Sequence, residues 1–211
     1  MDRLSRIPLL AGGLAGVLWL VGVLVLEAAG NPADPADGSV IAEFYRDDRA
    51  TILFASVLHA LGGLLFLVFV AALWPLATAG GAPHWLATAV VVGGVAGGTM
   101  MLAMMGGQST GATTDEALLT PDTAVVFWRL AHGFFVGAEI ALALFVGALS
   151  GLALRGFVLP RWLGWFGLVL AILLVLLPIG WAALIFLLPV WLVLASIVLW
   201  RRTRVTTAPA P

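Results

Sequence analysis

The chain has 211 residues, 62% of them hydrophobic and 10% charged, with a formal net charge of −1. Because an ordinary soluble domain carries about 25% charged residues, this composition excludes such a fold. The sequence contains no cysteine, which excludes disulfides, thiolate metal sites and iron–sulfur clusters. Its apolar residues form uncharged runs of about 18 residues or more, long enough to cross a hydrocarbon core of about 30 Å. We therefore expect an all-α fold, a polytopic bundle of transmembrane helices.

Three membrane-spanning helices are predicted in the first half of the chain. The first covers about 7–28, an apolar run too long for the core of a signal peptide. Turn formers and acids dominate 29–49, which predicts an outer acidic loop. The second and third helices cover about 50–77 and 85–106, and the short Gly-Gly-Ala-Pro link between them predicts a helical hairpin.

Three more helices are predicted in the second half. Residues 107–120 form a second outer acidic loop, after which a Thr–Pro pair, typical of a helix start, opens the fourth helix over 121–154. That helix would be about 50 Å long and must tilt or project beyond the membrane. A proline and a glycine divide the next apolar stretch into helices five and six, over about 159–177 and 181–200. The remainder, 201–211, is expected to be a disordered cytoplasmic tail.

Basic and acidic residues fall on opposite sides of this six-helix arrangement. The basic side holds Arg3, Arg6, Arg155, Arg161, Arg201, Arg202 and Arg204. The acidic side holds Asp34, Asp37, Glu43, Asp47, Asp48, Asp115, Glu116 and Asp122. Because arginine-rich segments stay on the cytoplasmic side, both termini are predicted to be cytoplasmic.

Five ionisable side chains remain inside the predicted helices: Glu27, His59, Arg129, His132 and Glu139. Such groups are costly in a membrane and are expected to face the interior of the bundle. Three of them lie on the fourth helix, where Arg129 and His132 are about 60° apart and Glu139 falls within about 20° of His132. This helix is therefore predicted to carry one polar stripe.

These polar groups have one structural interpretation and several functional ones. They can form ion pairs that fix the bundle, such as His59 with Glu139, while Arg129 meets Glu27 or the outer acids. A proton or ion path would use the same groups, but no such group continues it to the cytoplasmic face. A haem would take His59 and His132 as its two axial ligands. A metal-dependent hydrolase needs a denser cluster of histidines and carboxylates, so we assign no catalytic residue, metal site or cofactor.

Small residues recur four positions apart on several helices, in the pairs Gly12 and Gly16, Gly93 and Gly97, Gly94 and Gly98, Gly133 and Gly137, and Gly147 and Gly151. Such pairs allow close helix approach, either within the bundle or with a second copy or a membrane-protein partner. Four methionines of helix three, Met100, Met101, Met104 and Met105, fit packing beside these glycines better than copper(I) binding. The chain has no basic surface suited to nucleic acid, so the lipid bilayer is the main expected partner.

Three stretches carry a resemblance to a known family: Phe44-Tyr-Arg-Asp-Asp-Arg49, Phe66 to Trp74, and Val158-Leu-Pro-Arg-Trp-Leu-Gly-Trp-Phe-Gly167. Together they resemble a widespread group of uncharacterised actinobacterial multi-pass membrane proteins with a domain of unknown function. The resemblance implies the bacterial cytoplasmic membrane and about six helices, and it supplies no activity or catalytic residue.

The expected function is that of a structural or accessory membrane component without catalytic activity. The alternative is a small transporter or channel-like protein that uses the polar stripe of the fourth helix. A haem-binding protein or another membrane enzyme is the third interpretation.

Overall fold

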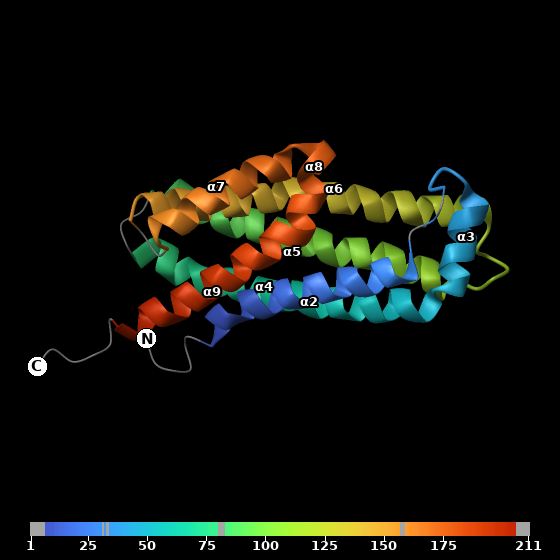
Figure 1. Ribbon diagram of the computed structural model, residues 1–211, viewed down its shortest axis with the longest axis horizontal. Coiled ribbons are helices and arrows are strands. Elements are labelled where there is room, and N and C mark those ends of the chain that lie inside the picture. The colour runs from blue at the N-terminus through green and yellow to red at the C-terminus, as the bar shows by residue number, and fades with distance from the viewer. Residues whose placement is uncertain (1–6, 31, 33, 80–82, 157–158, 206–211) are drawn as a thin grey trace, which may run out of the picture.

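The computed structural model describes residues 7–30, 32, 34–79, 83–156 and 159–205 (Figure 1). This part of the chain is helical and contains no strand. Five of its helices are long and apolar enough to cross a membrane. Large apolar side chains such as Leu61, Val92 and Leu144 are exposed on outward faces, as expected for a surface that contacts lipid. The chain is thus an all-α, multi-pass membrane protein.

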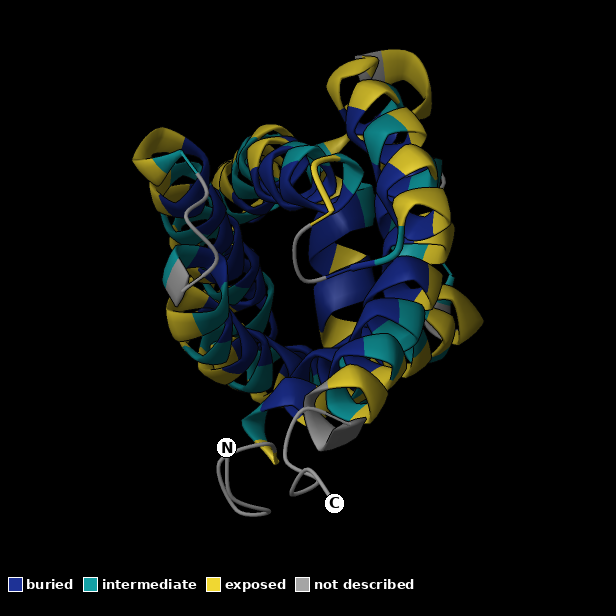
Figure 2. Ribbon diagram, turned by 90° about the vertical axis from the view of Figure 1, so that its left-hand side faces the viewer, coloured by how far each residue is buried: buried dark blue, intermediate teal, exposed yellow. Residues whose placement is uncertain are grey.

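Four long antiparallel helices form the main bundle. They are α2 (Pro8–Ala29), α4 (Arg49–Ala79), α5 (His84–Thr113) and α6 (Pro121–Leu154). The helices pack in chain order, α2 on α4, α4 on α5 and α5 on α6. Seen along the bundle, their buried residues face inward and their exposed residues face outward (Figure 2). A core of apolar side chains therefore fills the bundle.

The predicted start of the fourth helix is confirmed. The side chain of Thr120 accepts a hydrogen bond from the backbone N–H of Thr123 at 3.3 Å, and Pro121 occupies the first turn of α6. Both features suit a helix N-terminus, where the first backbone N–H groups have no partner within the helix.

Glycines allow the helices of this chain to approach one another closely. A Cβ on Gly93 would lie 2.6 Å from the backbone nitrogen of Phe145 on α6. A Cβ on Gly16 would lie 2.9 Å from the backbone oxygen of Pro189 on the last helix. Gly133 differs from them, because a Cβ there would meet nothing within 4 Å. The glycines Gly93 and Gly16 thus serve packing inside the bundle, whereas a partner at a glycine face stays a prediction.

The last part of the chain differs from the two full-length helices that were expected. Helix α7 (Arg161–Val175) has 15 residues, about 22 Å, which is shorter than the hydrocarbon core. A short helix α8 (Leu177–Ala182), a π-helical turn η1 (Ala183–Leu187) and α9 (Leu188–Val205) follow it. The fifth candidate span is Pro178–Arg202, so the proline that was expected to break the chain opens a helix instead. Helix α9 also continues into the predicted tail, of which 206–211 lie outside the described residues.

These last helices cover only part of the main bundle. Helix α7 packs on α6, and α9 packs on α2. Figure 1 shows that α7, α8 and α9 stop well short of the end at which α3 lies. Beyond them the described part of the main bundle continues with α2, α4, α5 and α6.

A helix, α3 (Gly38–Asp47), lies within the stretch predicted as the first acidic loop. The side chain of its N-cap, Asp37, accepts a hydrogen bond from the backbone N–H of Ser39 at 2.8 Å. The apolar residues Ile41, Phe44 and Tyr45 are buried against the ends of the long helices, at the three- and four-residue spacing of one helix face. Helix α3 therefore covers one end of the bundle (Figure 1).

Most charges divide between the two ends of the molecule, although Arg46 and Arg49 lie at the acidic end. The acidic end comprises α3 and the connection 114–120 between α5 and α6. The arginine end holds Arg155, Arg161, Arg201 and Arg202, together with the start of α2 and the end of α9 (Figure 1). The opposition of bases and acids that was expected from the sequence is thus present between the ends of the described bundle.

Candidate functional site

A pocket of about 190 Å³ lies inside the bundle on its acidic-end side. Its walls come from α2, α4, α5, α6 and η1, and its lining residues are Val23, Leu26, Glu27, His59, Met104, Met105, Gln108, Trp128, Ala131, His132, Phe135 and Ile185. Three of the five ionisable residues singled out from the sequence, Glu27, His59 and His132, therefore meet at one place. Arg129 and Glu139 do not line it.

His59 is the deepest polar side chain of the pocket, with 1% of its surface exposed. Its ring atom Nδ1 lies 2.9 Å from the backbone oxygen of Ala55, one helical turn earlier on α4. A carbonyl oxygen can only accept, so Nδ1 carries the hydrogen and donates it. In the neutral ring Nε2 then holds a lone pair, and this atom is buried without a hydrogen-bond partner in the described part of the chain. His59 thus offers the pocket an unused hydrogen-bond acceptor.

The position of the His59 ring is fixed by the contact between α2 and α4. Gly22 on α2 faces the imidazole, and a Cβ at that position would lie 2.5 Å from ring atom Cε1. The indole Nε1 of Trp19 donates a hydrogen bond to the backbone oxygen of His59 at 3.2 Å. Gly62 on α4 makes room for that indole, since its own Cβ would lie 2.7 Å from Trp19 Cδ1. These contacts place the ring independently of any bound molecule.

Gln108 is a site residue that sequence reasoning missed. It was assigned to the loop 107–120, but α5 continues to Thr113 and brings Gln108 one turn beyond Met104 onto the same wall. Its Oε1 atom is buried without a hydrogen-bond partner among the described residues. The sequence did allow the third helix to continue past residue 106, because the residues around Gln108 contain no proline to end it.

The mouth of the pocket lies between α2 and α6. The deep wall is buried, as at Met104 and Ala131, whereas Glu27 on α2 and His132 on α6 are exposed. Helix α2 packs on α4, α9 and η1, and α6 packs on α5 and α7, but along the described chain these two helices do not pack closely against each other. The His132 ring stacks on that of Phe135, with centroids 6.3 Å apart. The pocket therefore opens on the side of the bundle.

An apolar cluster closes the pocket toward the acidic end. Phe44 of α3 contacts Trp128 of the pocket wall edge to face, with ring centroids 6.0 Å apart. Tyr45, Ile41 and Leu119 are buried in the same cluster. Burial raises the pKa of Tyr45 above its ordinary value, as expected for a phenol surrounded by apolar groups. Access along the bundle axis is thus blocked by side chains.

The pocket is also closed toward the arginine end. Past His59 lies a cavity of about 20 Å³, roughly the space of one water, whose lining includes the apolar residues Met101 and Leu184. Further toward the arginine end, the ring of Phe145 packs against that of Phe66, with centroids 5.1 Å apart, and against that of Trp191, with centroids 6.2 Å apart. This floor separates the pocket from the arginine end, so within the described residues the site is a blind pocket.

The two remaining sequence candidates lie elsewhere. Glu139 is buried near the start of the α8 segment, where a Cβ on Gly180 would lie 3.2 Å from its Oε1. The ion pair of His59 with Glu139 that was weighed from the sequence is not formed, since the His59 ring bonds to Ala55 instead. Arg129 is exposed on α6. The predicted stripe is therefore divided between the pocket, the surface and the α8 contact.

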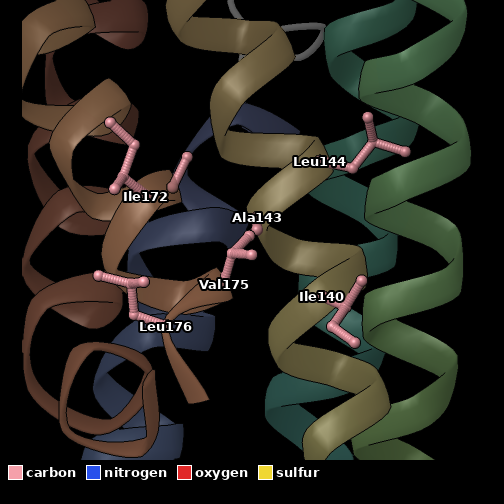
Figure 3. Close-up of a pocket in the computed structure, with 7 residues that line it drawn as sticks. Ile140, Ala143, Leu144, Ile172, Val175 and Leu176 are labelled. Atoms are coloured by element: carbon pink, nitrogen blue, oxygen red, sulfur yellow. The ribbon is translucent and has the colours of Figure 1, made fainter. Parts of the chain in front are cut away.

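A second hollow, on the surface of the bundle, is lined only by apolar side chains. It has a volume of about 500 Å³ and lies between α6 and α7 (Figure 3). Its lining side chains, including Ile140, Leu144, Ile172 and Val175, are all apolar. A surface of this kind, without hydrogen-bonding groups, fits acyl chains of the bilayer and offers nothing to recognise a specific ligand.

The donor set of the pocket limits what it can hold. No three histidine, aspartate or glutamate side chains gather closely enough to bind a metal ion within the described ranges. The volume is below the about 300–1,000 Å³ of pockets for drug-sized ligands, which favours a molecule smaller than haem. No family model, curated protein or solved structure matches this chain, so the assignment of this site rests on its own residues.

Proposed function

We propose that this chain is a bacterial plasma-membrane protein that binds a small molecule in the pocket around His59, as a sensing protein or as the binding half of a transporter. The observation that carries the proposal is the buried Nε2 atom of His59, an acceptor that no other described residue satisfies. Leaving a buried polar group unsatisfied costs about 1–3 kcal/mol. Natural proteins keep few such groups, and one that faces a pocket is available to a bound molecule or water.

Two unsatisfied acceptors in one pocket make the argument stronger. Gln108 Oε1 is the second, and it belongs to a different helix from His59. A volume of about 190 Å³ holds about six waters at about 30 Å³ each, so the site is either hydrated or occupied by a ligand. Apolar walls with a few convergent polar groups are the usual composition of a ligand site.

The orientation proposed from the sequence accompanies this function. With α7 as a short sixth crossing, both termini lie in the cytoplasm together with the arginine end. The concentration of arginines at one end of the bundle supports this orientation, and the family resemblance supports a bacterial plasma membrane. The pocket then faces the outer half of the membrane.

The absence of native cysteine permits a direct test of the pocket. Ala131 and Ala138 lie on α6 seven residues apart, and they are 1% and 0% exposed respectively. Only Ala131 lines the pocket. We expect a small membrane-permeant thiol reagent to modify the Ala131→Cys variant and to leave Ala138→Cys unmodified in lipid nanodiscs. Molecules that bind the pocket should slow the modification of Ala131→Cys.

Equal, slow modification of the two variants would mean that the pocket is closed, and the binding function would then be rejected. In that case the accessory role becomes the better proposal. Its support is the acidic outer face of α3, where Glu43 and Asp47 are exposed one helical turn apart. Loss of a co-purifying membrane partner on Glu43→Ala and Asp47→Ala substitution would then be the relevant observation.

A further inference from the structure

We infer that the ligand is a small, mainly apolar molecule with one head group that donates hydrogen bonds, and that it enters from the bilayer through the mouth between α2 and α6. This inference rests on the proposed function, whose pocket it uses, and it adds the chemical class of the ligand and its route. It follows from the polarity of the lining, the size of the pocket and the position of its mouth.

The two buried polar atoms of the pocket that have no hydrogen-bond partner among the described residues are both acceptors. His59 Nε2 accepts because Nδ1 is committed as a donor to Ala55. Gln108 Oε1 accepts, and the carboxylate of Glu27 at the mouth can only accept when it is ionised. A ligand with a hydroxyl or a protonated amine can donate to His59 Nε2 or Gln108 Oε1, whereas an ether or a ketone has no hydrogen to donate to them.

The remaining lining is apolar and sets the size of the ligand body. Leu26, Met104, Met105 and Phe135 supply aliphatic, thioether and aromatic surface around the polar groups. A cavity of about 150 Å³ is known to hold a benzene molecule. At about 190 Å³ this pocket has room for one six-membered ring with a small head group.

The position of the mouth suits a molecule that first dissolves in the membrane. Glu27 follows Pro8, the first residue of α2, by 19 residues, which places it about 28 Å along the helix axis. Since the hydrocarbon core is about 30 Å thick, the mouth lies near its outer boundary. Small amphiphiles concentrate at that boundary, with the head in the polar layer and the body among the acyl chains. The apolar cluster around Phe44 and Trp128 blocks the alternative route along the bundle axis.

The test compares molecules of nearly the same shape that differ in the hydrogen-bond donor. Phenol carries a donor, anisole is its methyl ether without one, and benzylamine supplies an ammonium. Each is added to full-length Ala131→Cys protein in phosphatidylcholine nanodiscs, and the rate of thiol modification is measured at equal concentrations in the membrane. We expect phenol or benzylamine to protect at about tenfold lower concentration than anisole, the difference expected for one hydrogen bond to a buried acceptor.

Substitutions then locate the interaction. Adding His59→Leu should abolish the advantage of phenol over anisole, and adding Gln108→Leu should reduce it. His84→Leu is the matched control, because His84 is an exposed histidine at the arginine-end start of α5 and should leave the advantage unchanged. If only benzylamine protects, and Glu27→Gln removes its protection, the head group is an ammonium. If only phenol protects, the head group is a hydroxyl.

The failures of the two proposals have different signatures. Equal protection by phenol and anisole, or no protection by any of the three while Ala131→Cys still reacts, overturns the assigned ligand class and leaves the pocket in place. An unreactive Ala131→Cys removes the binding function itself. An advantage of phenol that survives both His59→Leu and Gln108→Leu also overturns the inference, because the donor would then be bound elsewhere.

Discussion

Substitution of Gly22 by alanine tests how the His59 ring is held. A Cβ at Gly22 would lie 2.5 Å from His59 Cε1 and would also meet Nδ1, so the imidazole has to move. Overpacking of this kind costs about 1–3 kcal/mol. Moving the ring also breaks the hydrogen bond to Ala55, which adds about 0.5–1.5 kcal/mol. Alanine favours the helix by about 1 kcal/mol over glycine, so the net expected destabilisation is about 1–3 kcal/mol.

The assay is reversible unfolding of the purified protein in mixed micelles, followed by circular dichroism. Gly133→Ala is the matched control, since a Cβ there meets nothing and the substitution should stabilise by up to about 1 kcal/mol. The decisive comparison repeats Gly22→Ala in a His59→Ala background, where the clash is gone and the substitution should become neutral or stabilising. An equal cost of Gly22→Ala in both backgrounds would refute the contact described between Gly22 and His59.

Three further predictions concern the acidic end and the orientation. Tyr45→Phe removes a buried hydroxyl without a hydrogen-bond partner in the described structure, so the same unfolding assay should show an unchanged or slightly higher stability. Hydrogen bonds from Ser39 lower the pKa of Asp37, so this cap stabilises α3 above about pH 4 and is lost as the pH falls through the lowered value. The protection factors of the α3 amides, which correct for the intrinsic pH dependence of hydrogen exchange, should therefore fall at low pH in the native protein and show no such acid step in Asp37→Asn. In intact cells an impermeant thiol reagent should label Glu116→Cys and leave His84→Cys unlabelled, and the reverse pattern would invert the proposed orientation.

The sequence predicted the long helices well because length and hydropathy alone determine them. The fourth helix was expected over 121–154, and α6 begins at Pro121 and ends at Leu154. The end of the third was misplaced, since polar Gln108 and the residues after it still form helix when α3 and α6 cover them. Hydropathy reports what can enter lipid, whereas the continuation of a helix beyond the membrane depends on tertiary contacts.

Helix α3 and the α7–α9 region escaped prediction for a related reason. The acidic residues around Ile41, Phe44 and Tyr45 led to the prediction of a loop. These three residues nevertheless form a short apolar helix face, which is stable because it packs against the ends of the long helices. In the α7–α9 region, helix five was expected to end at about 177 and α7 ends at Val175, but composition did not reveal the short α8 and the π-helical turn that follow it. Tertiary packing determines both features, and a hydropathy pattern does not contain it.

The candidate site was only partly predictable. His59 and His132 were recognised as unusual residues for a membrane helix, and both line the pocket. The ion pair of His59 with Glu139 that was weighed is not formed, because helical angles place residues on one helix and leave the depth and rotation of its neighbours open. The role of Gly22 had no signal in the sequence, since it depends on a contact between two helices.

The opening between α2 and α6 has a thermodynamic consequence. These helices are held together mainly through their other neighbours, so a molecule in the pocket supplies contacts that the protein itself lacks there. A ligand that binds only the folded bundle stabilises it by RT ln(1 + [L]/Kd), about 2.7 kcal/mol at one hundred times Kd. The free energy of unfolding of the bundle would then rise with the logarithm of the ligand concentration in the membrane. Binding of the proposed ligand would in this way make the stability of the folded bundle depend on the ligand concentration in the membrane.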